Sequence, residues 1–289
     1  MVNPAAGSWR GRAMIPEVRR AFAAVGVTEI RETRDKGDDG AATSRAIEDG
    51  FTTIVAVGGD GTWGAVARAI VDSGRPCALA LLAAGTGNDF AKTAGVPAGD
   101  LAATVRLVLA GRTTRVDVGR IDGTVFLNVA GFGFDVAVLE DMERAGPLRG
   151  VARYYAAALR HLFTYRGISA GIARDEPGNT PRHAHLLIVI ANARRFGGAF
   201  LIAPHASIDD GVLDLVAIRH ASPLGRMRLF AAATRGAHLQ HAEVTTDRGA
   251  RFYFAFDEAP SYEVDGELRR ARSSRVVVEC LPAALAIVA

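Results

Sequence analysis

Cysteine, lysine, net charge and long apolar runs are all scarce in this chain of 289 residues. Cys77 and Cys280 are its only cysteines and lie far apart in apolar stretches, so we expect two buried thiols in a reducing compartment and neither a disulfide nor a metal site. A formal net charge of +3 is too small to demand nucleic acid as a partner. No apolar run reaches the ~18–20 residues that a membrane-spanning helix needs. Residues 1–4 lack the basic and apolar segments of a secretory signal, so we expect a cytoplasmic protein.

The residues that are present indicate a well-ordered globular protein. Hydrophobic residues make up 49% of the chain and charged residues 22%, both near globular averages, so disorder is not expected. The length allows one large domain or two of ordinary size. Almost all the positive charge is arginine, which suits phosphate-bearing partners because the guanidinium group is weakly hydrated and always charged.

A glycine-rich turn at residues 57–62 (VGGDGT) joins a predicted strand to a predicted helix. The strand, residues 53–57, is apolar and β-branched enough to be buried on both faces. Ligands bind where such parallel strands end, and glycine amides, a helix start and the Thr62 hydroxyl favour phosphate. Asp60 repels phosphate unless a divalent cation lies between them, so it indicates metal-bridged nucleotide chemistry. The alternative is a tight turn with Asp60 as an ordinary turn residue.

A second glycine turn repeats this arrangement. The predicted strand at residues 76–82 is followed by residues 85–90 (GTGNDF) and then by a helix, for which Asn88 is a candidate cap. Adjacent parallel strands would bring both turns to the same edge of the sheet. Two such turns are more specific than one, so the sequence favours a phosphate site.

The chain begins with a loop of mostly small residues, 3–8 (NPAAGS), with almost no strand before it. Apolar residues at helical spacing over 15–25 predict a helix next, which makes the loop a second phosphate contact at a helix start. A flexible N-terminal tail is the alternative. Residues 28–33 are predicted as a short strand and 41–49 as a helix that leads into the central strand.

The second half of the chain is predicted to be β-rich and sandwich-like, with inserted helices. Two alternating stretches joined by Asp122-Gly123 form a strong hairpin signal. The hairpin strands are residues 115–121 and 124–130, and further strands are expected at 167–174, 185–192, 213–220, 251–257, 261–264 and 275–281.

Two predicted helices, residues 148–163 and 223–239, are basic and amphipathic. Such helices lie on anionic membranes, or cover a sheet with their arginines in solvent. Acidic residues gather in the loop 203–212 and at Asp214, where they either attract a hard cation or serve as turn formers. Residues 264–267 (VDGE) place a carboxylate just after a tight turn, which taken alone is a hairpin tip.

In this order the motifs resemble the diacylglycerol kinase catalytic-domain family, which includes bacterial lipid kinases and sphingosine kinases. The first glycine turn also fits NAD kinases and phosphofructokinases, but GTGNDF and the terminal DGE separate this family from those. The resemblance covers nearly the whole chain. It is carried by Asn3-Pro4 with Gly7, residues 58–62 and 85–90, Asn192 with residues 196–198, residues 204–211, and Asp265-Gly266-Glu267.

The resemblance implies an α/β ATP-binding domain over residues 1–114 and a β-sandwich domain over 115–289, whose last residues pack back on the first domain. ATP would phosphorylate a lipid hydroxyl in the cleft between them. The residues implied to bind ATP are Asn3, Pro4, Ala5, Ala6, Gly7, Thr33, Gly58, Gly59, Asp60, Gly61, Thr62, Trp63, Gly64, Ala65 and Thr86.

The resemblance also implies the metal-binding and catalytic residues. Asp60 and Asp89 would organise a catalytic Mg²⁺ and the transferred phosphoryl group, and Glu267 would be the general base. The resemblance further implies a structural Mg²⁺ that Asp210 and the backbone carbonyls of Ser207 and Val212 would hold. Asp117 would link this ion to the active site.

Some positions depart from the family pattern. The strand before Asn3 is almost absent, and Ala6 replaces a serine that family members often carry. Gly64 and Ala65 stand where the family commonly has asparagine and glutamate, which removes an expected polar contact near the nucleotide.

We therefore expect a cytoplasmic, membrane-peripheral, magnesium-dependent lipid kinase that uses ATP and converts diacylglycerol to phosphatidic acid. Its partner would be a lipid substrate at a membrane surface and not nucleic acid, with a homodimer left open. The alternatives are a kinase of another lipid alcohol, such as phosphatidylglycerol or a sphingoid base, a kinase of a soluble metabolite such as NAD, and a catalytically silent lipid- or nucleotide-binding protein.

Overall fold

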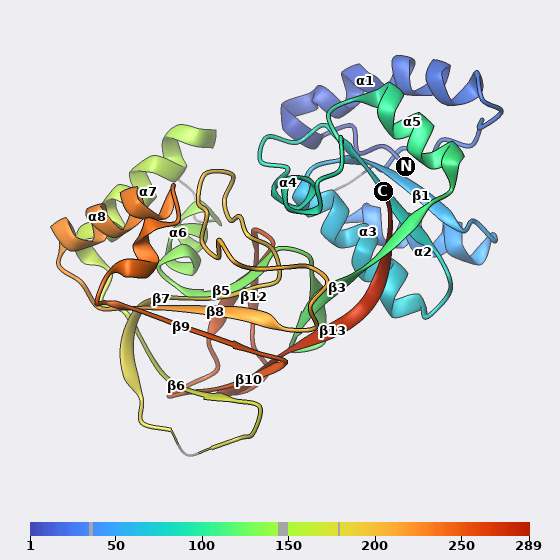
Figure 1. Cartoon of the computed structure of the whole chain (residues 1–289). Coiled ribbons are helices and arrows are strands. Elements are labelled where there is room, and N and C mark those ends of the chain that lie inside the picture. The colour runs from blue at the N-terminus through green and yellow to red at the C-terminus, as the bar shows by residue number, and fades with distance from the viewer. Residues whose placement is uncertain (35–36, 144–149, 179) are drawn as a thin grey trace.

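The computed structural model describes residues 1–34, 37–143, 150–178 and 180–289, which fold into two lobes (Figure 1). An α/β lobe contains the N-terminal helices, and a β-rich lobe contains most of the strands. This arrangement confirms the predicted fold class. Cys77 and Cys280 are both buried and free, as expected.

The sheet of the α/β lobe is parallel. β1 (Thr53–Gly58) pairs with β2 (Ala78–Ala83), and the end of β13 (Arg275–Val288) adds a third parallel strand, with Ile287 opposite Leu79. The carboxyl ends of β1 and β2 therefore lie at one edge, and each runs directly into a glycine turn.

The first residues of the chain lie along the other side of β1. The Val57 amide donates a hydrogen bond to the carbonyl of Met1 at 2.9 Å, and the Thr33 amide donates to the carbonyl of Val2 at 3.0 Å. The strand predicted over residues 28–33 is wrong in its extent, because its pairing with the chain start is reduced to a single bridge. These bonds fix the start of the N-terminal loop beside the end of β1.

Helices cover both faces of this sheet (Figure 1). α1 (Ala6–Ala23) and α5 (Leu101–Ala110) pack on one face, and α2 (Asp38–Glu48) and α3 (Asp60–Ser73) pack on the other. α4 (Asp89–Ala94) follows β2. Because both faces are covered, β1 and β2 are apolar along their length, which explains their uninterrupted hydrophobic runs.

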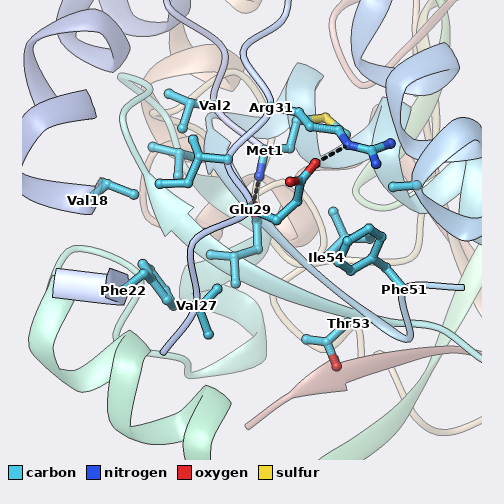
Figure 2. A pocket seen from close by; sticks show the side chains of 14 residues that line it. Met1, Val2, Val18, Phe22, Val27, Glu29, Arg31, Phe51, Thr53 and Ile54 are labelled. Carbon is cyan, nitrogen blue, oxygen red and sulfur yellow. Dashed lines mark hydrogen bonds and ion pairs between the residues drawn. The ribbon is translucent and has the colours of Figure 1, made fainter. Parts of the chain in front are cut away.

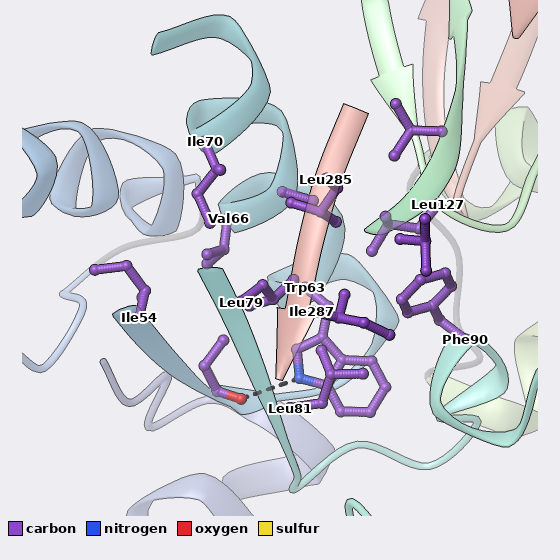
Figure 3. Packing of buried hydrophobic residues seen from close by; sticks show 14 of the residues in the cluster. Ile54, Trp63, Val66, Ile70, Leu79, Leu81, Phe90, Leu127, Leu285 and Ile287 are labelled. Atoms are coloured by element: carbon purple, nitrogen blue, oxygen red, sulfur yellow. Dashed lines mark hydrogen bonds between the residues drawn. The ribbon is translucent and has the colours of Figure 1, made fainter. Parts of the chain in front are cut away.

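Figure 3 shows the core beneath α3, which contains Trp63. Trp63 is 0% exposed, and its indole N–H donates to the carbonyl of Ala56 on β1 at 3.0 Å. It belongs to one cluster with Leu79 of β2 and Ile287 of β13. Trp63 belongs to the stretch implied to bind ATP, but its side chain is enclosed in the core. Only its backbone could therefore contact a nucleotide, and that assignment stays a prediction.

The β-rich lobe is built from antiparallel strands. Their order is β13-β10-β6-β7-β5-β11-β12, with β8 between β7 and β9, and β3 between β13 and β4. The bounds are β3 (Thr113–Ile121), β4 (Thr124–Phe126), β5 (Val129–Gly133), β6 (Ile168–Arg174), β7 (His183–Ala191), β8 (Leu213–Arg219), β9 (Val244–Gly249), β10 (Arg251–Phe256), β11 (Ser261–Val264) and β12 (Glu267–Arg270).

Most predicted strands of this lobe are confirmed to within two residues at each end. The hairpin at Asp122-Gly123 is also confirmed, and both residues have left-handed backbone angles, φ +46° and +83°. Its second strand ends at Phe126, and β5 begins separately at Val129. β9 and β12 are strands that the sequence pattern does not predict, and β13 continues beyond the predicted end at residue 281.

Helices α6 (Phe134–Glu143), α7 (Gly150–Thr164) and α8 (Pro223–Ala233) lie together beside β5, β7 and β8 (Figure 1). A short 3-10 helix, Ala237–Gln240, follows α8. The helix predicted over residues 223–239 is therefore wrong in its extent, because α8 ends six residues earlier. Across the ranges that the structure describes, every helix is too short or too polar to cross a lipid bilayer.

Strand β13 joins the two lobes. Its first half pairs with β10, and after a bulge between Leu281 and Leu285 it continues along β3. Ala286 and Ile287 then pair with β2 of the α/β lobe. One continuous strand thus sets the position of each lobe relative to the other.

A small cavity of about 100 Å³ lies between α1 and β1 (Figure 2). Its apolar lining includes Val18, Phe22 and Phe51. The Met1 amino group donates to the carbonyl of Val55 at 2.8 Å, and burial lowers the pKa of this amine to about 6. The cavity shares no lining residue with the interlobe cleft described below.

Arg226 ties α8 to the end of α7. The residue is 2% exposed, and its guanidinium donates to the carbonyls of Ala221, His161, Leu162 and Tyr165 at 2.7–3.2 Å. The last carbonyls of a helix have no partner within the helix. One buried arginine therefore satisfies the C-terminal end of α7 and holds α8 against it.

We predict that Arg226→Met destabilises the protein by about 2–4 kcal/mol, because it leaves buried carbonyls without donors. Urea unfolding measures the change. Arg228→Met is the matched control, since Arg228 is on the same helix but exposed, and it should shift the free energy of unfolding by less than about 0.5 kcal/mol. Equal losses in the two variants would contradict the role of Arg226.

Candidate active site

The two glycine turns touch at the edge of the α/β sheet. A Cβ built on Gly59 would lie 2.9 Å from the Cα of Gly85, and one built on Gly85 would lie 2.6 Å from the Cα of Gly59. Only glycine at both positions allows this approach. The prediction that both turns share one edge is therefore confirmed. The N-terminal loop joins them, because a Cβ on Gly7 would lie 1.9 Å from the carbonyl oxygen of Ala84.

Asp60 and Asp89 converge over Gly87 of the second turn. A Cβ built on Gly87 would be 3.1 Å from Oδ2 of Asp60 and 3.7 Å from Oδ2 of Asp89. The other oxygen of Asp60 accepts the Phe90 amide at 3.0 Å, which fixes the orientation of its carboxylate. Glycine at position 87 thus leaves open a space that two carboxylates face.

Asp89 is held by groups from both lobes. Its Oδ1 forms an ion pair with Lys92 at 3.1 Å, and its Oδ2 accepts the Gly198 amide of the β-rich lobe at 2.6 Å. Asn128, also from the β-rich lobe, donates to Asp60 at 3.4 Å. Asn128 and Lys92 are not predicted from the sequence, since neither stands in a motif that marks it. Asn88 occupies the N-cap position of α4, as predicted, but its side chain donates to the carbonyl of Gly85 and makes no capping hydrogen bond.

These residues line a cleft of about 420 Å³ between the lobes. The α/β lobe supplies Asp60, Asp89 and Thr86 with Gly87. The β-rich lobe supplies Asn128, Val129, residues 195–198, Asp265 and Gly266. Residues far apart in the sequence therefore meet in one space large enough for a small-molecule ligand.

A cluster of polar side chains braces the N-terminal loop against the first glycine turn. Asn3 donates to Thr62 at 2.9 Å and to Asp39 at 3.0 Å. Burial raises the pKa of Asp39, and hydrogen bonds from Thr33, Asn3 and Thr62 oppose that rise. Asp39 is not predicted from the sequence, because two aspartates at the start of a helix are common. The side chains of Thr33, Asp39 and Thr62 are buried, so they hold the loop and the turn together.

The other residues predicted to bind ATP lie on the backbone around this cluster. Ala5 and Ala6 donate their amides to the side-chain and main-chain oxygens of Asn3. Pro4 precedes them, and Gly7 is left-handed, with φ +58°.

Gly58 is closed off by Thr62, and the exposed Gly61 lies at the start of α3. On α3, Gly64 approaches Asp265, since a Cβ there would be 3.1 Å from Oδ2, and Ala65 is half-buried.

Asp265 anchors the turn that contains the predicted base. Its carboxylate accepts the amides of Leu127 at 2.8 Å, Asn128 at 2.8 Å and Val129 at 3.1 Å. Burial raises the pKa of Asp265 to about 6, and the three amides oppose the rise. Asp265 lines the cleft. The sequence pattern DGE does not by itself indicate this position.

Glu267 lies two residues further along and is not among the residues lining the cleft. Its carboxylate forms an ion pair with Arg269 at 3.0 Å, and its side chain is 39% exposed. The structure therefore brings Asp60, Asp89 and Asp265 together and places Glu267 just outside. Its assignment as the base stays a prediction.

Asp135 and Glu263 form a buried pair of acids behind this turn. Glu263 accepts the Gly266 amide at 2.8 Å, and both side chains approach Gly131, where a Cβ would lie 2.3 Å from Oδ2 of Asp135 and 3.3 Å from Oε1 of Glu263. Burial raises the pKa of Asp135 to about 7, and burial followed by the Asp135 charge raises that of Glu263. The pair is therefore protonated in part at neutral pH.

This pair makes stability depend on pH. The folded pKa of Asp135, about 7, is above its ordinary value of 3.8, so the folded state holds a proton that the unfolded state releases. Stability from this group is complete below pH 4 and is lost as the pH rises to about 7. We predict that Asp135→Asn stabilises the protein at pH 8 by on the order of 2–4 kcal/mol relative to its effect at pH 5.

Urea unfolding of the wild type and the variant at both pH values measures this difference. Asp257→Asn is the control, because Asp257 is exposed and paired with Arg182, and it should show no such dependence. A stability change for Asp135→Asn that is equal at pH 5 and pH 8 would rule out the proposed titration.

The residues implied to hold a structural magnesium lie together, and both of their carboxylates already have partners within the protein. Asp117 is buried and accepts the amides of Gly211 at 2.6 Å and Ala283 at 2.7 Å. Asp210 accepts the Val212 amide at 3.2 Å and forms an ion pair with Arg248.

Arg248 also approaches Asp214 at 3.4 Å, and the Ser207 hydroxyl bonds to Asp209. Within the described ranges, no three His, Cys, Asp or Glu side chains are placed to share a metal. In this arrangement the guanidinium of Arg248 supplies the positive charge beside Asp210, and the assignment of a structural Mg²⁺ to this loop stays a prediction.

The fold and the paired carboxylates define a kinase-like cleft, and comparison with known proteins identifies the family. The diacylglycerol kinase catalytic domain matches residues 1–121, and the YegS C-terminal NAD kinase beta sandwich-like domain matches residues 128–289. The chain belongs to the diacylglycerol kinase catalytic-domain family. It is therefore a lipid kinase, a phosphotransferase that acts on an alcohol group.

Individual relatives agree with this family. The chain is 27% identical over 267 residues to a diacylglycerol kinase of Bacillus subtilis (strain 168), covering 92% of this chain and 88% of that protein. It is 32% identical over 249 residues to a diacylglycerol kinase of Mycobacterium tuberculosis (strain ATCC 25618 / H37Rv), covering 84% and 78%. The fold is similar to the crystal structure of a diacylglycerol kinase from Bacillus anthracis str. Sterne, with a TM-score of 0.73, 20% identity and coverage of 99% and 94%.

Proposed function

We propose that this protein transfers the γ-phosphoryl group of ATP to the free hydroxyl of diacylglycerol and releases phosphatidic acid. The observation that carries the proposal is the convergence of Asp60 and Asp89 over Gly87, at the edge where two glycine turns touch. The names of the relatives support diacylglycerol as the acceptor.

The glycine turns would bind the phosphates of ATP. Gly59 and Gly85 leave room for backbone amides to approach an anion, and the start of α3 adds a partial positive charge. Asn3, Asp39 and Thr62 hold the N-terminal loop beside this turn. A cradle fixed before binding loses little entropy when the nucleotide arrives.

Asp60 and Asp89 fit a magnesium ion. Mg²⁺ is typically bound by one or two carboxylates together with substrate phosphates and water, and these two carboxylates face the open space over Gly87. When bound, the ion would neutralise charge on the phosphates during transfer. The hydrogen bonds from Phe90 and Gly198 would hold the two carboxylates in place for it.

Glu267 would accept the proton of the acceptor hydroxyl. An alcohol is a weak nucleophile at neutral pH and needs a carboxylate within hydrogen-bond reach. Asp265 already accepts three amides and so serves to position the turn. Among the described residues, Glu267 is held by a half-buried ion pair with Arg269, and a pair of this kind is worth about 0–1 kcal/mol, so its side chain can rotate toward a bound lipid.

We predict that Glu267→Gln lowers kcat at least about 100-fold and leaves the KM for ATP unchanged. The assay uses labelled ATP with a panel of acceptors: diacylglycerol, phosphatidylglycerol, a sphingoid base and NAD. Glu279→Gln is the matched control, because Glu279 is also paired with an arginine on a strand of the same lobe, and it should keep full activity.

The same assay tests the acceptor. Label in phosphatidic acid supports the proposal, whereas label only in an aqueous product refutes a lipid acceptor for this protein. Equal activity of the Glu267→Gln and Glu279→Gln variants would show that Glu267 is not the base.

A further inference from the structure

Helices α7 and α8 expose large apolar side chains on neighbouring surfaces. Leu159 and Phe163 of α7 are each 60% exposed, and Leu224 and Met227 of α8 are 58% and 51% exposed. These four account for much of the exposed large apolar surface within the described ranges, and the rest is scattered over other elements. We call these four residues the apolar face. Clusters of this kind on a protein surface mark interaction sites.

Arg226 brings the two halves of the apolar face together. Its guanidinium donates to the carbonyls of Leu162 and Tyr165, on either side of Phe163. Arg226 itself lies between Leu224 and Met227 in the sequence of α8. The end of α7 and the start of α8 are therefore packed against each other (Figure 1). This packing places Phe163 close to Leu224 and Met227, which flank Arg226 on α8.

The exposed charged side chains of α7, α8 and the residues just beyond them are arginines. Residues 150–166 and 219–242 contain no aspartate or glutamate. Arg160 on α7 and Arg228 on α8 are exposed, and so are Arg166 and Arg235 just beyond the two helices. Asp141 of α6 pairs with Arg160 and is mostly buried. The surface is thus apolar at its centre and basic at its rim.

This surface is linked to the cleft by packed side chains. Phe196 lines the cleft and packs against Phe200, with ring centroids 6.4 Å apart. Phe200 in turn contacts Phe230 on α8 at 6.1 Å, and the Leu201 amide donates to the carbonyl of Ala233 at 2.9 Å. A binding partner on which α7 and α8 dock would therefore lie next to the loop that contains Phe196 and Phe200, beside the cleft.

We propose that α7 and α8 dock on an anionic phospholipid surface, with the apolar face inserted among the lipids and the arginines at the headgroups. Apolar burial and basic charge acting together give stable binding of a peripheral protein. A second copy of this chain is disfavoured as the occupant, because two faces rimmed by arginine repel each other. The proposal deepens the proposed function, since it explains how a lipid acceptor reaches the cleft.

Vesicle flotation tests the docking without ATP or acceptor. Wild-type protein should float with vesicles that contain phosphatidylglycerol and much less with phosphatidylcholine alone. The double variant Phe163→Ser/Met227→Ser should bind the anionic vesicles roughly tenfold more weakly. Leu109→Ser is the matched control, because Leu109 is 57% exposed on α5 of the other lobe, and it should bind like the wild type.

A second variant tests the charge. Arg228→Gln/Arg235→Gln should weaken binding to anionic vesicles by roughly five- to tenfold, and added salt should reduce the difference from the wild type. Thermal melting of every variant should match the wild type, because all the changed side chains are exposed. The proposal is overturned if the wild type does not float, if the serine variant floats equally well, or if light scattering shows a dimer that the serine variant abolishes.

Activity separates this proposal from the function on which it rests. A short-chain diacylglycerol that dissolves as a monomer should be phosphorylated equally by the wild type and the serine variant, whereas diacylglycerol in anionic vesicles should be phosphorylated more slowly by the variant. Flotation without phosphorylation of any lipid would refute the proposed function and leave the docking surface standing. Phosphorylation of vesicle lipid at equal rates by both proteins would refute the docking surface alone.

Discussion

The geometry of the cleft depends on strand β13, because this strand belongs to the sheets of both lobes. It pairs with β10 and β3 in the β-rich lobe and with β2 in the α/β lobe. Asp60 and Asp89 come from one lobe, and Asn128, Gly198 and Asp265 come from the other. The bonds from Asn128 to Asp60 and from Gly198 to Asp89 cross between lobes that β13 holds together.

The cleft gathers negative charge in a way that costs stability. Asp265 is half-buried beside Asp60, and Asp135 and Glu263 lie behind the same turn, where burial raises the pKa of all three of these acids. A protein selected for stability alone would avoid carboxyl groups there. Their presence is understandable in a site that binds cations and phosphates. The carboxylates repel one another only until a ligand binds.

The arginines of this protein serve three different purposes. Arg226 is buried and satisfies helix carbonyls, and Arg248 neutralises acids in a loop where a metal was expected. Arg160 and Arg228 remain exposed around an apolar face. The guanidinium group suits all three, because it stays charged when buried, donates in several directions and binds phosphate oxygens.

The sequence by itself determined the elements whose signals are local. The glycine turns, the Asp122-Gly123 hairpin and the buried strands β1 and β2 follow from backbone freedom and hydrophobic pattern, which need no distant partner. The order of the motifs was enough to indicate the family and the fold class.

Only the tertiary structure decided which side chains meet. Trp63 lies in the core although its neighbours form the turn. Glu267 lies outside the cleft, while Asp265 lines it. Arg248 pairs with Asp210 in the acidic loop. Asp39 and Asn128 join the site from segments without a motif. The physical reason is that burial, pairing and pKa are set by contacts between residues far apart in the chain, which a local pattern does not encode.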